Sequence, residues 1–212
     1  MRTPNEEGII MGSLSFVNRV LLSVVLLLLL AVFSMQALAA SWSIDNTTSR
    51  VNFISIKANT IAENHHFKQI SGGLSADGQF SVDIDIASVD TLIEIRNQRM
   101  IDMLFEAAKF PKATLTAKVD MDALAAIGVG QQASMRLESS LELHGQSQTM
   151  PVQVRVARLA DKQLLVTSEQ PLLLNADAYN MSAGVEKLRE VAGLPSISPA
   201  VPVSFVISLT SN

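Results

Sequence analysis

The segment Phe80-Ser81-Val82-Asp83-Ile84-Asp85-Ile86 decides the fold class, because apolar and polar side chains alternate along it with a period of two. This alternation is typical of a β-strand with one buried face and one solvated face. The same pattern continues at 135–143 and 152–156. Further strand-like runs, which bring the expected total to about eight strands, lie at 50–57, 66–74, 113–120, 163–173 and 201–210.

The connections between these runs indicate how the strands are paired. They are short and polar or contain glycine, at 76–78, 144–147 and 160–162, and such turns join antiparallel neighbours. No alternation of strands with long helices appears, which argues against a parallel sheet. We therefore expect an all-β, antiparallel closed barrel, because closure removes exposed edges. A sandwich of two sheets is the alternative, since periodicity does not distinguish closure from stacking.

A first short helix is predicted between Ile95 and Pro111. Its apolar side chains fall on one stripe, and Pro111 marks the return to an extended chain. The stripe contains Met100, Met103, Leu104 and Ala107.

A second short helix is predicted from about Ser182 to Ala192, with Ser182 as its N-cap. Gly193 and Pro195 then supply a stop signal. We expect Val185, Leu188 and Ala192 to face inward. Both helices are too short to be stable alone, so they should pack on the sheet or close its ends.

The first 39 residues have the pattern of a secretory signal peptide. The stretch from Val20 to Phe33 is uncharged, and Ala37-Leu38-Ala39 supplies a small-x-small cleavage pattern. This stretch is shorter than the ~20 apolar residues that a membrane-spanning helix needs. We expect cleavage after Ala39 and a soluble single domain over 40–212, located in the periplasm or secreted. Met11 is an alternative start, because the acidic residues before it do not suit a positively charged leader.

The composition excludes two classes of protein. The chain carries a net charge of −4 and contains no cysteine. Without a cluster of Lys and Arg it lacks the positive surface that nucleic acid requires. Without cysteine it forms no disulfides, so its stability must come from the core.

Catalytic and metal-binding patterns are missing from the sequence. His65 and His66 follow Glu63, but adjacent strand residues point to opposite faces, and His144 is the only other histidine, so we predict no metal site. There is no Gly-x-Ser-x-Gly elbow and no cysteine nucleophile. We therefore expect a binding protein without a cofactor rather than an enzyme.

Three groups of short motifs carry a family resemblance. Trp42-x-Ile44-Asp45 opens the mature chain, and Ala87-Ser88-Val89-Asp90-Thr91 lies near its middle. The first helix then contributes Arg96, Leu104-Phe105 and Phe110-Pro111. In their order and spacing these motifs resemble the YceI-like family of lipid/polyisoprenoid-binding domains, and the resemblance covers nearly all of the mature chain.

Some positions depart from the pattern of that family. Asn97 stands where the family usually has Asp, and Arg99 where it often has His. The segment 175–181 is similar to the family's Asn-Arg-x-x-Phe-Gly-x motif but has Ala176 in place of Arg. An insert at 182–195, which many members lack, then follows.

The resemblance implies a lipocalin-like barrel that holds a lipid in an apolar cavity. The candidate ligand-binding residues are Phe53, Phe67, Phe80, Arg96, Met100, Met103, Leu104, Phe105, Leu115, Leu141 and Phe205. Arg96 is the candidate polar anchor; alternatively, its charge ties the helix to the barrel through a partner such as Asp90. The expected partners are an isoprenoid or other amphiphilic lipid, a membrane-derived quinone among them, and a second copy of the chain in a homodimer.

Two other functions compete with lipid binding. A filled barrel could act as a protein-interaction or stress-response module, with Ser182–Pro195 as its additional surface. An enzyme would require an interior polar residue such as Arg96 or Tyr179.

Overall fold

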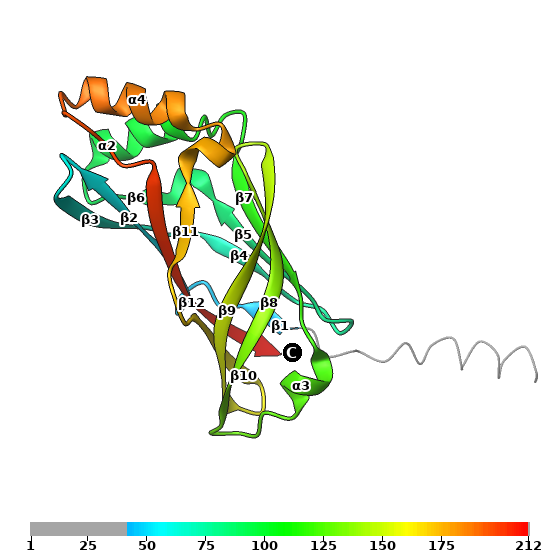
Figure 1. Cartoon of the computed structure of the whole chain (residues 1–212). Helices are drawn as coiled ribbons and strands as arrows, with labels where there is room; N and C mark the ends of the chain where they lie inside the picture. Colours follow the sequence, from blue (N-terminus) through cyan, green and yellow to red (C-terminus); the bar gives the residue numbers. More distant parts are fainter. Residues whose placement is uncertain (1–41, 212) are drawn as a thin grey trace, which may run out of the picture. The chain divides into compact units, whose positions relative to one another are not determined.

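The computed structural model of the chain describes residues 42–211, and every strand pairing in this range is antiparallel (Figure 1). The strands are β1 (Trp42–Ile44), β2 (Arg50–Lys57), β3 (Ile61–Phe67), β4 (Ile70–Leu74), β5 (Gln79–Asp85), β6 (Val89–Asp90), β7 (Lys112–Lys118), β8 (Gln132–Leu143), β9 (Gln146–Ala160), β10 (Gln163–Ser168), β11 (Leu172–Asn175) and β12 (Ala200–Ser211). The helical segments are η1 (Ile86–Ser88), α2 (Glu94–Arg99), η2 (Met100–Leu104), α3 (Met121–Ala125), η3 (Ala176–Tyr179) and α4 (Ser182–Val191). The predicted signal peptide, its cleavage site and the alternative start at Met11 lie outside the described residues.

Eight of the strands found between residues 42 and 211 form a closed ring, in the order β1, β4, β5, β7, β8, β9, β10 and β12. The pairing of Trp42 with Ser211 and of Ile44 with Leu209 returns the ring from β12 to β1. The predicted closed antiparallel barrel is therefore confirmed. The sandwich alternative is excluded, because two stacked sheets keep free edges whereas this ring has none.

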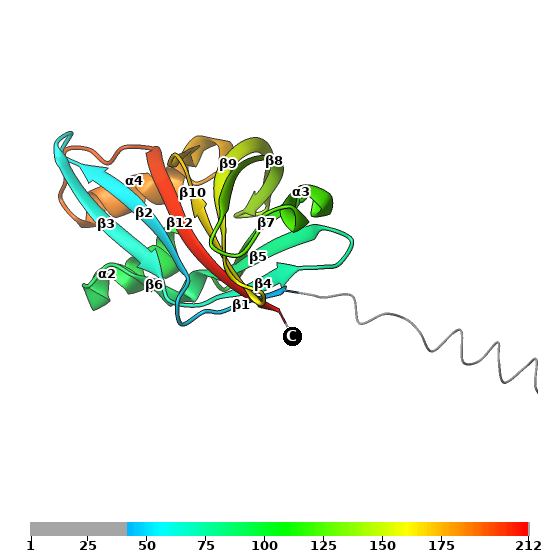
Figure 2. The ribbon, with the colours of Figure 1, turned by 90° about the horizontal axis from the view of Figure 1, so that it is seen from below.

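Strand β12 gives the barrel two different ends (Figures 1 and 2). From Val206 to Thr210 it pairs with β10, and its last residues also pair with β1. Its first half pairs instead with β11 and β2, and β2 continues the sheet to β3 and β6. We call the half with the complete ring the closed end. The other half, flanked by β2, β3 and β11 and covered by α2, η2, η3 and α4, is the lid end.

The alternation that predicted the strands also forms the core. Phe80 and Val82 of β5 are buried, as are Val152, Val154 and Val156 of β9. These side chains come from opposite walls of the ring and meet in its interior, where burial of apolar surface supplies most of the stability.

Two of the predicted strands are each divided in the structure. The run 66–74 contains the end of β3 and all of β4, and the run 163–173 contains β10 and the start of β11. In the first run the chain changes its hydrogen-bonded neighbours, because β3 pairs with β2 whereas β4 pairs with β5 and β1. In the second run both strands pair with β12, but β10 also pairs with β9. An alternating pattern reports which face is buried but not which strand lies alongside, so it does not reveal these breaks.

The first helix is confirmed, but it ends earlier than predicted. The regular α-helix stops at Arg99 and continues as the π-helix η2, in which the Phe105 N–H donates to the Met100 carbonyl. Glu106 then has a φ of 48°, which ends the helix well before Phe110. Wider helical turns of this kind occur often beside functional sites.

The second helix is also confirmed, with two corrections. Met181 rather than Ser182 is the N-cap, and the Ser182 hydroxyl donates instead to the Asp177 carboxylate. Ala192 is exposed rather than inward-facing. Helix α3 and the short 3-10 segments were not predicted, because they are only one turn long and carry no clear periodicity.

Candidate functional site

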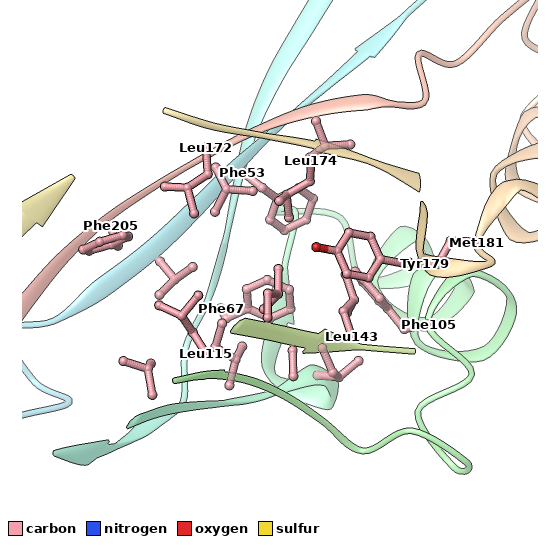
Figure 3. Close-up of a pocket in the computed structure, with 18 of the residues that line it drawn as sticks. Phe53, Phe67, Phe105, Leu115, Leu143, Leu172, Leu174, Tyr179, Met181 and Phe205 are labelled. Carbon is pink, nitrogen blue, oxygen red and sulfur yellow. The ribbon is translucent and has the colours of Figure 1, made fainter. Parts of the chain in front are cut away.

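An apolar cavity of about 160 Å³ lies at the lid end, between the barrel and the segments that cover it (Figure 3). On the same measure a single water molecule needs roughly 10–15 Å³. Strands β2, β3, β5, β7, β8, β11 and β12 supply its walls, and η2, η3 and α4 supply residues that cover it. Among the lining residues in the described part of the chain, only Asn175 and Tyr179 have polar side chains.

Most of the predicted site residues come together at this cavity. Those that line it are Phe53, Phe67, Phe80, Leu104, Phe105, Leu115, Leu141 and Phe205. Arg96, Met100 and Met103 are not among the lining residues, and Met100 is buried in the core instead.

The prediction missed several wall residues on β11 and α4. Leu172 and Leu174 line the cavity, whereas Leu173 between them is exposed. The alternation of facing within this short strand is the sequence signal that could have identified Leu172 and Leu174 as wall residues. Val185 of α4 also lines the cavity, and its inward orientation was predicted.

Helix α4 packs closely on η2 because Gly184 has no side chain. A Cβ at this position would lie 2.7 Å from the Met103 carbonyl oxygen and 2.8 Å from the Leu104 Cα. Contacts this short are not possible for a residue with a Cβ, so glycine is what lets the two backbones approach. This approach places Leu104 and Val185 over the same cavity.

His144 connects the end of η3 to the chain just after η2. It lies with Gly145 in the turn between β8 and β9, and both residues have positive φ, 52° and 73°, as a two-residue type I′ turn requires. Its Nδ1 lies 3.1 Å from the Tyr179 carbonyl oxygen and its Nε2 lies 2.9 Å from Glu106 Oε2. Both partners are acceptors, so the tautomer of the imidazole decides which of them receives its N–H.

Arg96 ties α2 to the barrel rather than pointing into the cavity. Its Nη1 lies 2.8 Å from Glu63 Oε2, and its Nη2 donates to the Thr91 carbonyl at 2.6 Å. The geometry therefore shows the alternative role of Arg96, in which its charge ties the helix to the barrel, and its partner is Glu63. The expected partner, Asp90, pairs instead with Lys68, at 3.7 Å.

The charges around Glu63 form a small network. Lys57 Nζ lies 2.7 Å from the same oxygen, Oε2, that Arg96 contacts. The hydrogen bond from Lys57, and then that from Arg96, holds the pKa of Glu63 below its ordinary value of 4.5. The network is partly exposed, so water screens it and its contribution to stability is modest.

His65 lies beside this network on the inner face of β3. Its Nε2 is 2.8 Å from the Ser55 hydroxyl, and its ring packs on Phe53 with the centroids 5.1 Å apart. Its Nδ1 is buried and has no hydrogen-bond partner in the described part of the chain. Burial, and then the positive charge of Arg96, lowers the pKa of His65 below 6.5. The folded protein therefore favours the neutral imidazole here.

Asn97, which replaces the family's usual Asp, has a structural role. Its Oδ1 accepts hydrogen bonds from the Thr91 N–H at 2.8 Å and from the Thr91 hydroxyl at 2.6 Å. An amide oxygen accepts both bonds as a carboxylate would, without the cost of burying a charge. Asn97 thus anchors the loop before α2.

The Tyr179 side chain enters the cavity from η3. The residue is only 2% exposed, its hydroxyl has no hydrogen-bond partner among residues 42–211, and Figure 3 shows the oxygen directed into the cavity. Burial raises the pKa of Tyr179 above its ordinary value of 10.0. The hydroxyl is therefore a neutral group that can donate a hydrogen bond.

Two other kinds of site are not found in the described residues. Between residues 42 and 211, no three His, Cys, Asp or Glu side chains lie together in a way that could hold a metal ion. None of the helices in this range has the length and hydropathy needed to cross a bilayer.

The chain matches a known family and a solved structure over most of its length. The model of the YceI-like domain family matches residues 42–209. A polyisoprenoid binding domain from Saccharophagus degradans, implicated in plant cell wall breakdown, shares 40% sequence identity. That alignment covers 81% of this chain and 98% of the other, with a TM-score of 0.79.

More distant structures share the fold. BcnA from Burkholderia cenocepacia is 20% identical with a TM-score of 0.60, over 78% of this chain and 98% of the other. A YceI protein from Campylobacter jejuni is 16% identical with a TM-score of 0.50, over 68% and 82% respectively. A comparison with curated proteins gives no match.

Proposed function

Because this chain belongs to the family of YceI-like domains, we propose that it is an exported protein that binds a long-chain isoprenoid or another amphiphilic lipid in the apolar cavity. The observation that carries the proposal is the cavity itself, whose walls consist almost wholly of Phe, Leu, Val and Ile side chains. The 40% identical domain from Saccharophagus degradans is a polyisoprenoid binding domain, which supports a ligand of this class. Within that class we propose a quinone or a polyprenyl lipid.

Burial of the ligand's apolar surface is sufficient to provide affinity. Each buried CH₂ contributes ~0.8 kcal/mol, or up to ~4 kcal/mol for an isoprene unit before the costs of binding. At the ~0.3 kcal/mol per heavy atom that large ligands achieve, a forty-carbon chain gains ~12 kcal/mol. Such a ligand needs no charged anchor, which is consistent with Arg96 being held by Glu63 and Thr91.

The size of the cavity sets a condition on binding. An apolar cavity of about 150 Å³ in another protein holds one benzene molecule, so a cavity of about 160 Å³ receives only a short part of a long isoprenoid chain. A longer chain requires more room than the segments over the lid end leave in this conformation. We infer that η2 and α4 move outward when the ligand enters.

Part of the insert at 182–195 contributes to this cavity. Gly184 packs on η2, and Val185 lines the cavity. No contact of α4 specifically favours a protein-docking role, so we propose no second function.

The proposal is tested on protein purified from the exported fraction of its native cell. Native mass spectrometry should show bound lipid at about one molecule per chain, and the polypeptide should begin at Ala40. After removal of the lipid, a polyprenyl quinone added at about one hundred times its Kd should stabilise the fold by ~2.7 kcal/mol and raise the Tm by roughly 5–10 °C.

A matched pair of variants links this binding to the cavity. Leu115→Trp fills the cavity and should abolish both the bound lipid and the rise in Tm, whereas Thr116→Trp on the opposite face of β7 should keep both. If the purified protein carries no lipid and neither a quinone nor a polyprenol raises its Tm, the proposal is wrong.

A further inference from the structure

Among the residues that the structure describes, the Tyr179 hydroxyl is the one buried polar group that points into the cavity. The side chain is 2% exposed, and its oxygen forms no hydrogen bond within residues 42–211. Figure 3 shows this oxygen among the labelled side chains of Leu174, Phe53 and Phe67. A buried hydroxyl without a partner is costly, so its presence in an apolar wall calls for an explanation.

The described residues around the cavity offer the hydroxyl no alternative partner. Asn175 is the other lining residue with a polar side chain, but it is exposed and its Oδ1 accepts the Asp177 N–H at 3.1 Å. A water molecule needs 2–4 polar partners in such a site, and the apolar walls supply no second one. The group that best satisfies the hydroxyl is therefore an oxygen atom carried by the ligand.

The backbone that carries the phenol ring is anchored at the end of η3. Tyr179 ends η3, its carbonyl oxygen lies 3.1 Å from His144 Nδ1, and Asn180 has the left-handed φ of 55° that terminates the segment. The side chain therefore enters the cavity from an anchored segment, and its burial limits the positions that the ring can take, as a group that selects between ligands requires.

We propose that Tyr179 is a specificity-determining residue, whose hydroxyl donates a hydrogen bond to a carbonyl oxygen of the bound lipid. This inference rests on the proposed function and adds that the cavity prefers a carbonyl-bearing isoprenoid to a plain hydrocarbon of the same length. A site with a fixed donor rejects the analogue that lacks the acceptor, because a buried polar group is then left unpaired.

The test uses two probes of equal chain length, an isoprenoid methyl ketone and the corresponding isoprenoid hydrocarbon. The full mature protein should bind the ketone about tenfold more tightly than the hydrocarbon, once each Kd is corrected for the partition of the probe into water. Tyr179→Phe should remove this preference by weakening the ketone about tenfold while leaving the hydrocarbon nearly unchanged. Phe105→Leu, which trims the apolar wall, should weaken both probes alike and keep the preference.

A second measurement separates recognition from a structural effect of the substitution. Tyr179 is the only tyrosine in the sequence, so a difference spectrum against Tyr179→Phe isolates its absorbance band from that of Trp42, the single tryptophan. The ketone should shift this band to longer wavelength, as donation of a hydrogen bond by a phenol does, more than the hydrocarbon shifts it. If both probes bind but the preference is the same in Tyr179→Phe, the inference is wrong and the proposed function stands; if neither probe binds, both are wrong.

Discussion

The closed end and the lid end of this barrel have the same inward-facing chemistry but different packing. At the closed end, side chains such as Leu164 and Leu209 fill the interior and leave a gap of only about 30 Å³. At the lid end the gap is about 160 Å³. An eight-stranded ring is just narrow enough for side chains to fill. At the lid end, β12 pairs with β2 and β11 instead of with β10 and β1, so the barrel is wider there. The cavity therefore exists because side chains do not fill this wider end, which helical segments cover.

The largest expected effect contrasts a leucine from each end. Leu164 is 0% exposed, so Leu164→Ala should lower the free energy of unfolding by about 2–5 kcal/mol. Leu174 already borders the cavity, so Leu174→Ala should cost only about 1–2 kcal/mol. Urea unfolding of the lipid-free protein measures both values. Equal costs would mean that the two ends are equally well packed in solution.

A smaller effect is expected at the contact between α4 and η2. Gly184→Val introduces a Cβ where the Met103 carbonyl lies, so α4 must move away at a cost of about 1–3 kcal/mol. Hydrogen exchange should rise in α2, η2 and α4 and stay unchanged at the closed end. Ala183→Val, at the exposed neighbouring position, is the control for the added β-branched residue. A similar exchange pattern in both variants would contradict the close packing at Gly184.

The smallest effect concerns pH and also distinguishes the two ends. Because burial lowers the pKa of His65, the unfolded chain takes up a proton below pH 6.5 that the folded chain resists. The free energy of unfolding should therefore fall as the pH drops below about 6.5, and His65 should account for at most ~1.4 kcal/mol of that fall per pH unit. Above about pH 6.5, the protonation of His65 should not affect the free energy of unfolding. Urea unfolding between pH 7 and pH 5 measures the slope, and exchange should increase first at the lid end.

The control for this pH dependence is the adjacent histidine. His65→Gln should flatten the slope, whereas His66→Gln, on the other face of β3, should retain it. An unchanged slope in His65→Gln would show that other groups determine the acid sensitivity.

Much of the site could be predicted because aromatic and aliphatic residues at alternate strand positions must face the interior. Phe53, Phe80 and Leu115 are examples, and each lines the cavity. The misplaced candidates lie on the first helix, where Met100 turns toward the core and Arg96 toward Glu63. A helical stripe specifies a face, but the widening of the turn at η2 and the packing of α4 decide which residues of that face reach the cavity.

By itself, the sequence determined the antiparallel strands, the two main helices and the family to which the chain belongs, because these depend on local periodicity and on ordered motifs. Tertiary structure alone decided that β1 meets β12 to close the ring, that β12 divides its partners between two ends, and that the Tyr179 hydroxyl enters an apolar cavity without a partner. These features depend on residues far apart in the chain, whose juxtaposition no local pattern encodes. The stretch from Phe80 to Ile86 shows both sides of this: its alternation predicts a strand, but only the closed barrel shows that Phe80 lies between the filled end and the cavity, lining both spaces.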